Sequence, residues 1–342
     1  MEADEIVEAV VSQVVGARLA TAAAAGVSHG GVRAIATAGT FSRDDARAID
    51  ADALFDLASV SKTYTAAVIA QLIAEGRLDP DAPVAEVLPV GSGPDAERIT
   101  LRMLLTHTAG LPSDVFLWKE PHVPERERLL RVLSTPLQTA PGAEFRYSCT
   151  GYIAAGAIAE TVTGRSLSDL VAARITSRLG AAATSYGPVP ADLAVATEDE
   201  SYIGRGLVRG EVHDELNWYL GGRVGNAGLF APIDDVLRFA ESFLDDGLLG
   251  PDGYPVMTRP SPIPDHAGGF AHSLGLRIGD ASFMGAAPAI GHTGFTGTMW
   301  WAIPEKQLAV VLLTNRVHPH RDAVDISPTR RRFSDQALAL VS

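Results

Sequence analysis

Apolar positions along the chain follow two patterns, one with the spacing of helices and one of short continuous runs. The helical spacing covers residues 1–25 and returns over 62–75, where Gly76 supplies a C-terminal stop. Further helices are predicted after a cap at Thr100, over 152–163, from a cap at Ser166 or Ser168 to Leu179, over 233–245 and after Asp322.

Short apolar runs bounded by turn residues predict strands near both ends of the chain. These strands are expected over residues 30–40, 54–57, 270–278, 292–301 and 308–313. The first two are expected to form a small sheet that leads into Ser59. The last two flank a turn at 304–306, and their mostly apolar composition predicts a hairpin covered on both faces.

Strands at both ends with helices between them predict a split domain in an α/β fold of the α+β type. We expect an antiparallel sheet flanked by helices and built from residues 1–58 and 220–342. A mostly helical domain, residues 59–219, is expected as an insertion, with the functional site in the cleft between the two. The length of 342 residues and the 46% hydrophobic content suffice for a large core in one composite domain or two.

Charge and composition argue against several kinds of partner. The formal net charge of −13 opposes phosphate backbones and anionic lipid surfaces, and a solvated helix face explains the longest basic run, 330–332. We therefore expect no nucleic-acid partner and no membrane partner. The first 25 residues lack the features of a signal peptide, and no later stretch approaches a membrane span. With a single cysteine, Cys149, and hence no internal disulfide, we expect a cytoplasmic protein whose oligomeric state is open.

The chemical feature that stands out is Ser59-Val60-Ser61-Lys62. If a helix begins after Leu57, residues three apart share one face, so the amine of Lys62 lies near the hydroxyl of Ser59. Ser61 lies about 100° round the helix and cannot take that place. The amine can activate the hydroxyl only if desolvation and nearby positive charge lower the lysine pKa. The alternative is a helix cap followed by a solvated lysine.

Lysine usage favours the chemical interpretation. The chain has only three lysines, Lys62, Lys119 and Lys306, and arginine supplies nearly all its other positive charge. Lys62 lies between an apolar run and an alanine-rich helix. A lysine kept at such a position indicates a need for an amine that can lose its proton, which arginine cannot do.

Other candidate motifs favour structural roles. The glycines of 221–228 fit neither a dinucleotide-binding pattern nor a P-loop. His107 lies at a helix end beside glycine and proline, a position typical of a histidine that holds a loop by hydrogen bonds. Two histidine pairs lack a carboxylate or cysteine at ligand spacing: His266 with His272, and His318 with His320. We therefore predict neither a metal nor an organic cofactor.

Four stretches together follow the order and approximate spacing of a known superfamily. They are residues 55–62, 104–112, 147–152 and 291–297. The chain resembles the serine β-lactamase and penicillin-binding-protein superfamily, most closely its class C-like esterase and peptidase branch. The resemblance covers about residues 31–315, and the joint occurrence of four modest motifs argues against chance.

The resemblance implies a role for individual residues. Ser59 is implied to be the acylated nucleophile and Lys62 its partner in the S-x-x-K motif. Tyr147 matches the tyrosine of the Y-x-N motif and is implied to share proton transfer with Lys62. This agrees with the physics, because a tyrosine needs a strong cationic neighbour to act at neutral pH. The backbone amides of Ser59 and Phe295 are implied to form the oxyanion hole.

Two residues, Cys149 and Asn226, depart from the family pattern, and the stretch at His292 follows a known variant of it. His292-Thr293-Gly294 falls where the family usually has lysine, threonine and glycine, and resembles its H-x-G variant. Cys149 stands where the family has asparagine, and a thiol donates and accepts hydrogen bonds weakly. Asn226 stands where close relatives often have histidine. We also expect aromatic pocket walls from Phe116, Trp118, Trp218 and Tyr219.

Three functions are compatible with these residues. The leading one is a serine hydrolase that forms an acyl-enzyme on Ser59 from a small-molecule ester or amide and releases it to water. The second is an acyltransferase that passes the acyl group to an alcohol or amine in a biosynthetic pathway. The third is a non-catalytic binding or sensor domain, which Cys149 and Asn226 motivate. True β-lactamase or cell-wall peptidase activity is disfavoured, because those substrates lie outside the inner membrane and Cys149 weakens the amide site.

Overall fold

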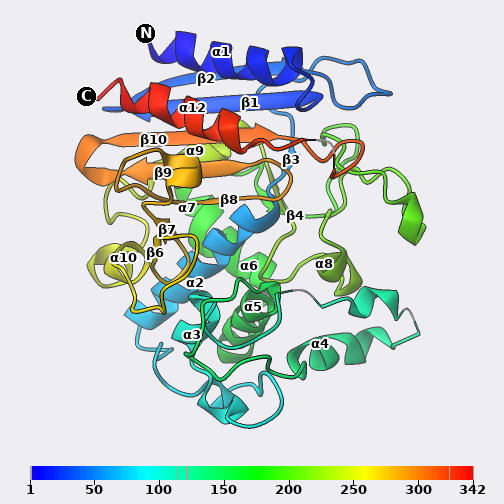
Figure 1. Ribbon diagram of the computed structural model, residues 1–342, viewed down its shortest axis with the longest axis vertical. Helices are drawn as coiled ribbons and strands as arrows, with labels where there is room; N and C mark the ends of the chain where they lie inside the picture. The colour runs from blue at the N-terminus through cyan, green and yellow to red at the C-terminus, as the bar shows by residue number, and fades with distance from the viewer. Residues whose placement is uncertain (1, 114, 121, 323, 342) are drawn as a thin grey trace.

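The computed structural model describes residues 2–113, 115–120, 122–322 and 324–341. Within these residues, the centre of the fold is a seven-stranded antiparallel sheet in the order β2-β1-β10-β9-β8-β7-β6 (Figure 1). The start of the chain contributes β1 (Ala22–His29) and β2 (Val32–Gly39). The end of the chain contributes β6 (Ala271–His272), β7 (Arg277–Ile278), β8 (Ile290–Thr293), β9 (Met299–Ile303) and β10 (Leu308–Thr314). The predicted antiparallel sheet built from both chain ends is confirmed.

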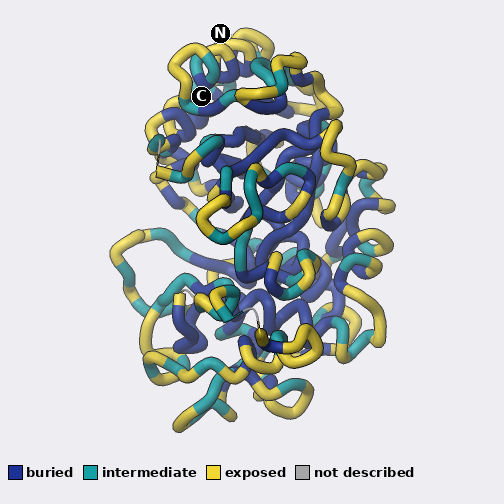
Figure 2. Tube along the Cα trace, turned by 90° about the vertical axis from the view of Figure 1, so that its right-hand side faces the viewer, coloured by how far each residue is buried: buried dark blue, intermediate teal, exposed yellow. Residues whose placement is uncertain are grey.

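Helices cover both faces of this sheet. On one face α1 (Ala3–Gly16), α11 (Ala281–Met284) and α12 (Ser327–Leu338) surround Trp301. On the other face α2 (Ser61–Ala74) and α9 (Ile233–Glu241) surround Trp300. Successive side chains of a strand point to opposite faces, so β9 is buried on both sides, as predicted for this hairpin. Figure 2 shows the resulting buried interior in dark blue beneath an exposed outer layer.

The helix predicted over residues 1–25 is wrong in its last part, because α1 ends at Gly16 and β1 begins at Ala22. Alanine is a strong helix former, which explains the error. However, β1 lies in the sheet between β2 and β10, where only small side chains fit beneath the covering helices. A Cβ atom at Gly26 would already lie 3.2 Å from a methyl group of Leu237 on α9. Tertiary packing therefore overrides local propensity here.

Other predicted strands are divided or placed differently. The segment 270–278 forms two short strands, β6 and β7, because the chain turns at Gly275, whose φ is 114°. The segment 292–301 contains parts of β8 and β9, and the tight turn between them is closed by the Gly294 N–H, which donates to the Thr298 carbonyl at 2.7 Å. The predicted strand at 54–57 does not join β2. It forms β3 (Phe55–Asp56), in a separate sheet with β5 (Leu229–Ala231) and β4 (Ser185–Tyr186).

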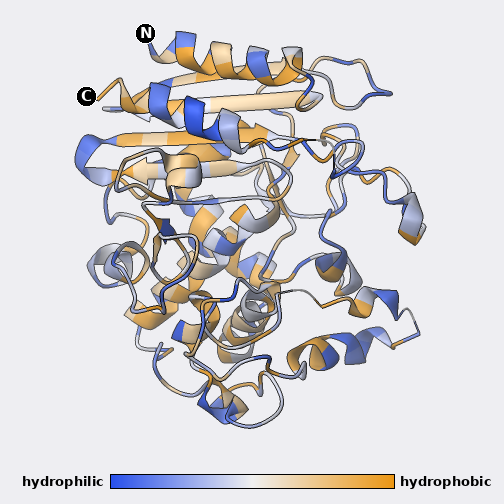
Figure 3. Cartoon of the chain, viewed as in Figure 1, coloured by the Kyte–Doolittle hydropathy of each residue, from blue (hydrophilic) through white to orange (hydrophobic). Residues whose placement is uncertain are grey.

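The regular elements in the middle of the chain are mainly helices joined by long loops, and the division into two domains stays a prediction. It contains α3 (Leu101–Leu105), α4 (Glu125–Leu133), α5 (Cys149–Thr163), α6 (Leu167–Val171), α7 (Ser177–Leu179) and α8 (Glu215–Tyr219), and α10 (Gly250–Thr258) follows α9. Thr100 caps α3 as predicted, and Gly164 ends α5 at a φ of 67°. In Figure 3 hydrophobic colour marks β9 and β10, and hydrophilic colour marks parts of α4 and α12. Within the described part of the chain, none of the helices has the length and apolar character needed to span a bilayer.

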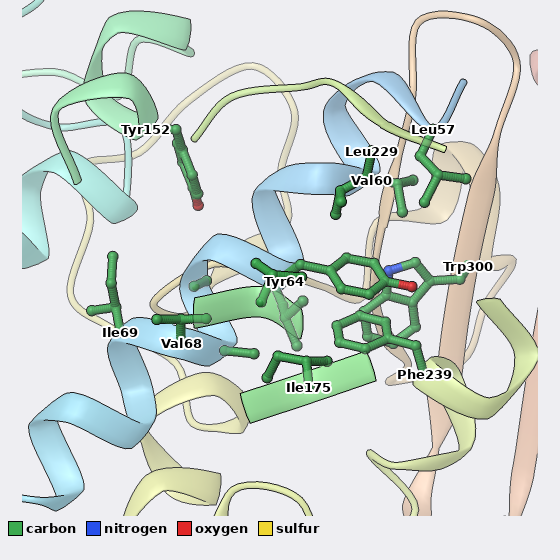
Figure 4. Close-up of a cluster of buried hydrophobic side chains, with 14 of the residues drawn as sticks. Leu57, Val60, Tyr64, Val68, Ile69, Tyr152, Ile175, Leu229, Phe239 and Trp300 are labelled. Carbon is green, nitrogen blue, oxygen red and sulfur yellow. The ribbon is translucent and has the colours of Figure 1, made fainter. Parts of the chain in front are cut away.

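Helix α2 connects the sheet to the helical region and is buried along most of its length. Tyr64 stacks on Phe239 of α9 with ring centres 3.8 Å apart. Trp300 of β9 donates its indole N–H to Thr63 at 3.3 Å. Figure 4 shows Tyr64, Phe239 and Trp300 grouped where α2 and α9 meet the sheet. These contacts fix α2, and with it the segment that precedes its first turn.

Candidate active site

Ser59 lies in a strand–turn–helix segment whose backbone is constrained. The chain leaves β3, passes through a short 3₁₀ turn at Ala58–Val60 and enters α2. Ala58 has a φ of 47°, in the left-handed region that side chains with a Cβ rarely adopt. Its N–H donates to the buried carboxylate of Asp56 at 2.8 Å, which supports the strained turn. Strain of this kind gathers at functional sites, and here it presents the partly exposed Ser59.

Lys62 is fully buried beneath Ser59. Its Nζ donates to Ser59 Oγ at 2.9 Å and to the Asn226 carbonyl at 2.9 Å. A third, longer contact of 3.6 Å reaches Cys149 Sγ. The structure therefore places the amine one helical turn from the hydroxyl, whereas Ser61 is occupied elsewhere and accepts from the Leu229 N–H at 3.2 Å.

The ring of Tyr147 lies 5.2 Å from Lys62 Nζ. Tyr147 and Ser59 line the same cavity, of about 520 Å³. We call it the arginine cavity, after Arg277, Arg316 and Arg330 in its wall. The hydroxyl at 59, the amine at 62 and the phenol at 147 thus converge on one partly desolvated place.

The protonation of Lys62 differs from the expectation. Burial lowers the pKa of Lys62, but interactions with Cys149, Tyr147 and the Asp214 carboxylate outweigh burial and leave that pKa above its ordinary value. The expected lowering of the lysine pKa is therefore wrong, and Lys62 rests as an ammonium group. It can donate a hydrogen bond to Ser59 but cannot accept the serine proton in that state.

The turn between β8 and β9 is fastened directly to the Ser59 segment. Thr296 Oγ1 donates to the Asp56 carbonyl at 2.8 Å, and Thr298 Oγ1 donates to the Leu57 carbonyl at 2.9 Å. A Cβ atom at Gly294 would overlap Thr298 Oγ1 and come within 2.5 Å of the Leu57 carbonyl oxygen, so only glycine fits. This close approach brings the backbone of Phe295 beside that of Ser59.

Two polar residues that the sequence analysis did not assign to the site hold these two backbone segments in place. Arg330 of α12 is buried, so the expected solvated face over 330–332 is wrong for this residue. It donates to the carbonyls of Gly294 and Thr298, both at 2.8 Å. Asp56 binds the Ala58 N–H with one carboxylate oxygen and accepts from the His213 N–H at 2.7 Å with the other. The position of Asp56 inside the apolar run before Ser59 could have indicated its structural role. Nothing near Arg330 in the sequence indicated that Arg330 binds the β8–β9 turn.

His292 and Thr293 are placed differently although they are neighbours on β8. Thr293 and Gly294 line the arginine cavity. His292 has no exposed surface, and its Nδ1 donates to the Thr293 carbonyl at 2.7 Å. Burial holds the pKa of His292 well below its usual value, so the ring is neutral. His292 is therefore buried near Tyr147, with ring centres 6.2 Å apart, and is not one of the residues that line the cavity.

A second cavity, of about 490 Å³, lies on the Cys149 side of Lys62. We call it the acidic cavity, and Phe116 and Trp118 form part of its wall together with Cys149. The other two expected wall residues lie elsewhere. Trp218 lines a smaller cavity of about 230 Å³, and Tyr219 is buried, with the Arg128 guanidinium 4.5 Å from its ring centre.

Asn226 is buried beside Cys149 and Lys62. Asn217 Nδ2 donates to Asn226 Oδ1 at 2.9 Å, which fixes the orientation of the Asn226 amide. Its Nδ2 then lies toward Cys149. Burial raises the pKa of the Cys149 thiol, so the sulfur is protonated at neutral pH. Both departures from the family pattern therefore lie in one small cluster around the lysine.

His107 holds a loop, as the sequence suggested. Its Nδ1 accepts from the Ser148 N–H at 3.1 Å, and its ring centre lies 4.3 Å from that of Tyr147. Burial keeps the pKa of His107 well below its usual value. The neutral ring therefore positions the segment that carries Tyr147 and Cys149.

One buried group among the described residues has the composition of a metal site, namely Glu198, Glu200 and His213. Two guanidinium groups already neutralise it. Arg205 lies 2.7 Å from Glu200, and Arg321 lies 2.8 Å from Glu198. A cation would have to compete with both arginines, so the group fits a buried ionic network better than a metal centre.

Comparisons with known proteins agree with this geometry. The chain matches the family described as Beta-lactamase over residues 7–333 and belongs to that family. A protein of Escherichia coli (strain K12) named as a D-alanyl-D-alanine carboxypeptidase is 29% identical over 337 residues, covering 84% of this chain and 74% of the relative. A protein of the same name from Salmonella agona (strain SL483) is 30% identical over 313 residues, covering 78% and 70%. The resemblance noted in the sequence is confirmed.

Solved structures share the fold over nearly the whole chain. The octameric penicillin-binding protein homologue from Pyrococcus abyssi has a TM-score of 0.78 at 21% identity, covering 99% of this chain and 78% of its own. EstCE1, described as a hydrolase with promiscuous acyltransferase activity, has a TM-score of 0.77 at 21% identity, covering 96% and 97%. A D-stereospecific amidohydrolase from Streptomyces sp. has a TM-score of 0.70 at 25% identity, covering 90% and 94%. The chain thus belongs to a family of serine hydrolases with peptidase-, esterase- and amidohydrolase-named neighbours.

Proposed function

We propose that the protein is a serine hydrolase that forms an acyl-enzyme on Ser59 from an ester or a small amide. The observation that carries the proposal is the 2.9 Å hydrogen bond from the buried Lys62 ammonium to Ser59 Oγ, beside Tyr147 at the mouth of a cavity. A nucleophile, a cation and a phenol in this order form an activated serine of a kind that needs no histidine.

The protonation of Lys62 sets the direction of proton transfer. An ammonium cannot take the serine proton, so the proposal gives that role to the Tyr147 oxygen in its deprotonated form, held beside the Lys62 charge. Ser59 Oγ bonds to the substrate carbonyl carbon, its proton passes to Tyr147, and the carbonyl oxygen becomes an oxyanion. Tyr147 then returns the proton to the leaving group as the bond to that group breaks.

The oxyanion is proposed to lie between the backbone N–H groups of Ser59 and Phe295. Each such donor is worth about 3 kcal/mol of transition-state stabilisation. Thr296, Thr298 and Arg330 keep the two backbone segments together, which is the preorganisation that this kind of stabilisation requires. In the second half of the reaction, a water oxygen bonds to the acyl carbon and its proton passes to Tyr147. Tyr147 then returns that proton to Ser59 Oγ as the bond between Ser59 and the acyl group breaks.

Acyl transfer to an alcohol or amine remains the second candidate, because the structural neighbour EstCE1 is described with that promiscuous activity. Product analysis separates the two. If an added alcohol or amine never competes with water for the acyl group, transfer is rejected. A pure sensor function is rejected by multiple turnovers of any substrate.

The test of the hydrolase proposal is labelling of Ser59 by a fluorophosphonate, together with turnover of short-chain nitrophenyl esters. Ser59→Ala should abolish both. Ser177→Ala, which changes an exposed serine on α7 outside both cavities, should leave the labelling intact. Persistent labelling or turnover in a folded Ser59→Ala variant would reject the proposal.

A further inference from the structure

The two cavities beside Ser59 differ in charge, and this difference bears on the substrate of the proposed reaction. Both cavities include Asp322 in their walls, so they adjoin. Apart from Asp322, the arginine cavity has three guanidinium groups and one carboxylate, that of Asp325, in its wall. The acidic cavity has four carboxylates and one guanidinium in its wall, again apart from Asp322. Ser59 therefore lies at a boundary between a positive and a negative cavity.

The position of Tyr147 assigns the two cavities to the two halves of a substrate. The group that protonates the leaving group must lie within hydrogen-bond reach of it. Tyr147 lines the arginine cavity, so the leaving group belongs there. Cys149 lines the opposite cavity across Lys62, so the acyl group extends into the acidic cavity.

The carboxylates of the acidic cavity are not fully compensated by its guanidinium. Arg321 is shared between Glu198 and Glu215, at 2.8 and 2.7 Å. Behind it, Glu200 is fully buried and pairs with Arg205 at 2.7 Å through one oxygen. Its other oxygen lies 3.6 Å from Arg321 and has no hydrogen-bond partner among the described residues. Asp214 also lines the cavity and forms no ion pair with any residue that the structure describes. Its charge acts on Lys62, so it lies close to the reacting centre.

The wall of the acidic cavity also contains aromatic rings, two of which contact the ammonium group of Lys119. Phe116 and Tyr202 line this cavity and are 58% and 59% exposed, so their rings are accessible to a bound molecule. The Nζ of Lys119 lies 4.9 Å from the ring centre of Phe116 and 5.1 Å from that of Trp118. Aromatic faces attract cations, but a substrate ammonium competes with Lys119 for these rings, so the carboxylates supply most of the attraction.

We infer that the acyl group of the substrate carries a protonated amine that binds in the acidic cavity between Asp214 and the aromatic wall. The inference rests on the proposed hydrolase function and narrows its substrate class to aminoacyl esters or amides. The arginine cavity disfavours a cation in the leaving group. The reaction at Ser59 is unchanged, since the amine is a binding group and takes no part in bond making.

The test compares matched nitrophenyl esters of ω-amino acids and of the corresponding unsubstituted carboxylic acids across a range of chain lengths. For at least one length, kcat/KM should be at least about 10-fold higher for the amino ester, and the ratio should fall as ionic strength rises. Asp214→Asn removes the charge but keeps a residue that caps helices equally well, so α8 should persist. This variant should lower the amino-to-neutral ratio at least about 5-fold, through KM more than kcat.

Asp252→Asn is the matched control, since Asp252 is an exposed carboxylate on α10 outside both cavities. Its amino-to-neutral ratio should equal that of the wild type. This inference alone is overturned if turnover depends on Ser59 but shows no preference for the amino ester at any chain length. It is also overturned if Asp214→Asn leaves the amino-to-neutral ratio unchanged. Absence of turnover for every ester, or turnover that survives Ser59→Ala, overturns the proposed function and this inference with it.

Discussion

The Gly294→Ala substitution tests whether the close approach of two backbone segments creates the oxyanion site. A Cβ atom at this position would lie 2.5 Å from the Leu57 carbonyl oxygen and would also overlap Thr298 Oγ1. The tightest ordinary contact is about 3.4 Å, so the β8–β9 turn must move away from the Ser59 segment by about 0.9 Å. Oxyanion donors act over a window of about 2.7–3.1 Å, so a shift of this size removes the Phe295 N–H from the site.

The loss of one such donor corresponds to about 3 kcal/mol, or a decrease in kcat of roughly 100-fold or more. The assay is steady-state turnover of a nitrophenyl ester alongside urea unfolding, so that folded protein is compared with folded protein. Gly16→Ala is the matched control, because Gly16 likewise has no positive φ and a Cβ there meets nothing within 4 Å. Its kcat should equal that of the wild type.

The double variant Gly294→Ala/Thr298→Ala separates the overlap with the Thr298 hydroxyl from the overlap with the Leu57 carbonyl oxygen. Removing the threonine hydroxyl relieves one overlap but leaves the backbone oxygen of Leu57 in place. We therefore expect no recovery of kcat. A folded Gly294→Ala variant with wild-type kcat, or full recovery in the double variant, would refute the claim that these two backbones must touch.

Three further predictions concern buried groups. Lys62→Met should lower kcat about 1,000-fold with the fold retained, because the serine loses its charged neighbour; ester turnover above a tenth of wild type would contradict the role of the amine. Burial raises the pKa of Glu200 from 4.5 to about 7, so the stability linked to its protonated form is complete below about pH 4.5 and is lost as the pH rises through 7. The free energy of unfolding of Glu200→Gln, relative to that of the wild type, should therefore rise by up to about 3 kcal/mol as the pH increases from 4.5 to 7, measured by urea titration. A difference that does not change with pH would contradict the raised pKa of Glu200. Tyr64→Phe should raise the free energy of unfolding by about 1 kcal/mol, since the Tyr64 hydroxyl is buried without a partner among the described residues; a loss of stability would show that the hydroxyl is satisfied.

The sequence was sufficient for the architecture and for the residues that meet at Ser59. The three-residue spacing from Ser59 to Lys62 fixed their contact as soon as a helix followed, and the apolar runs at both chain ends predicted the antiparallel sheet. The alanine-rich strand β1 was missed because its residues favour helix locally, and only the helices packed on both faces explain their small size. Strand composition alone also could not show that 270–278 turns back on itself at Gly275.

The protonation state and the cavity walls were beyond the reach of the sequence. The pKa of Lys62 is set by the balance between burial and residues as distant along the chain as Tyr147, Cys149 and Asp214, which no local pattern contains. Of the four aromatic residues expected in pocket walls, Phe116 and Trp118 line the acidic cavity. Tyr219, on a short helix, turned into the core instead.

The most direct test of acylation at Ser59 is mass spectrometry after brief exposure to an acyl donor such as an aminoacyl nitrophenyl ester. The mass of the intact protein shows whether an adduct forms, and peptide mapping shows where it lies. We expect a single acyl increment on the peptide that contains Ser59. It should disappear with time as turnover proceeds and should never form in Ser59→Ala. An increment located on Cys149, or sustained turnover without any adduct on Ser59 under rapid quenching, would contradict acylation at Ser59.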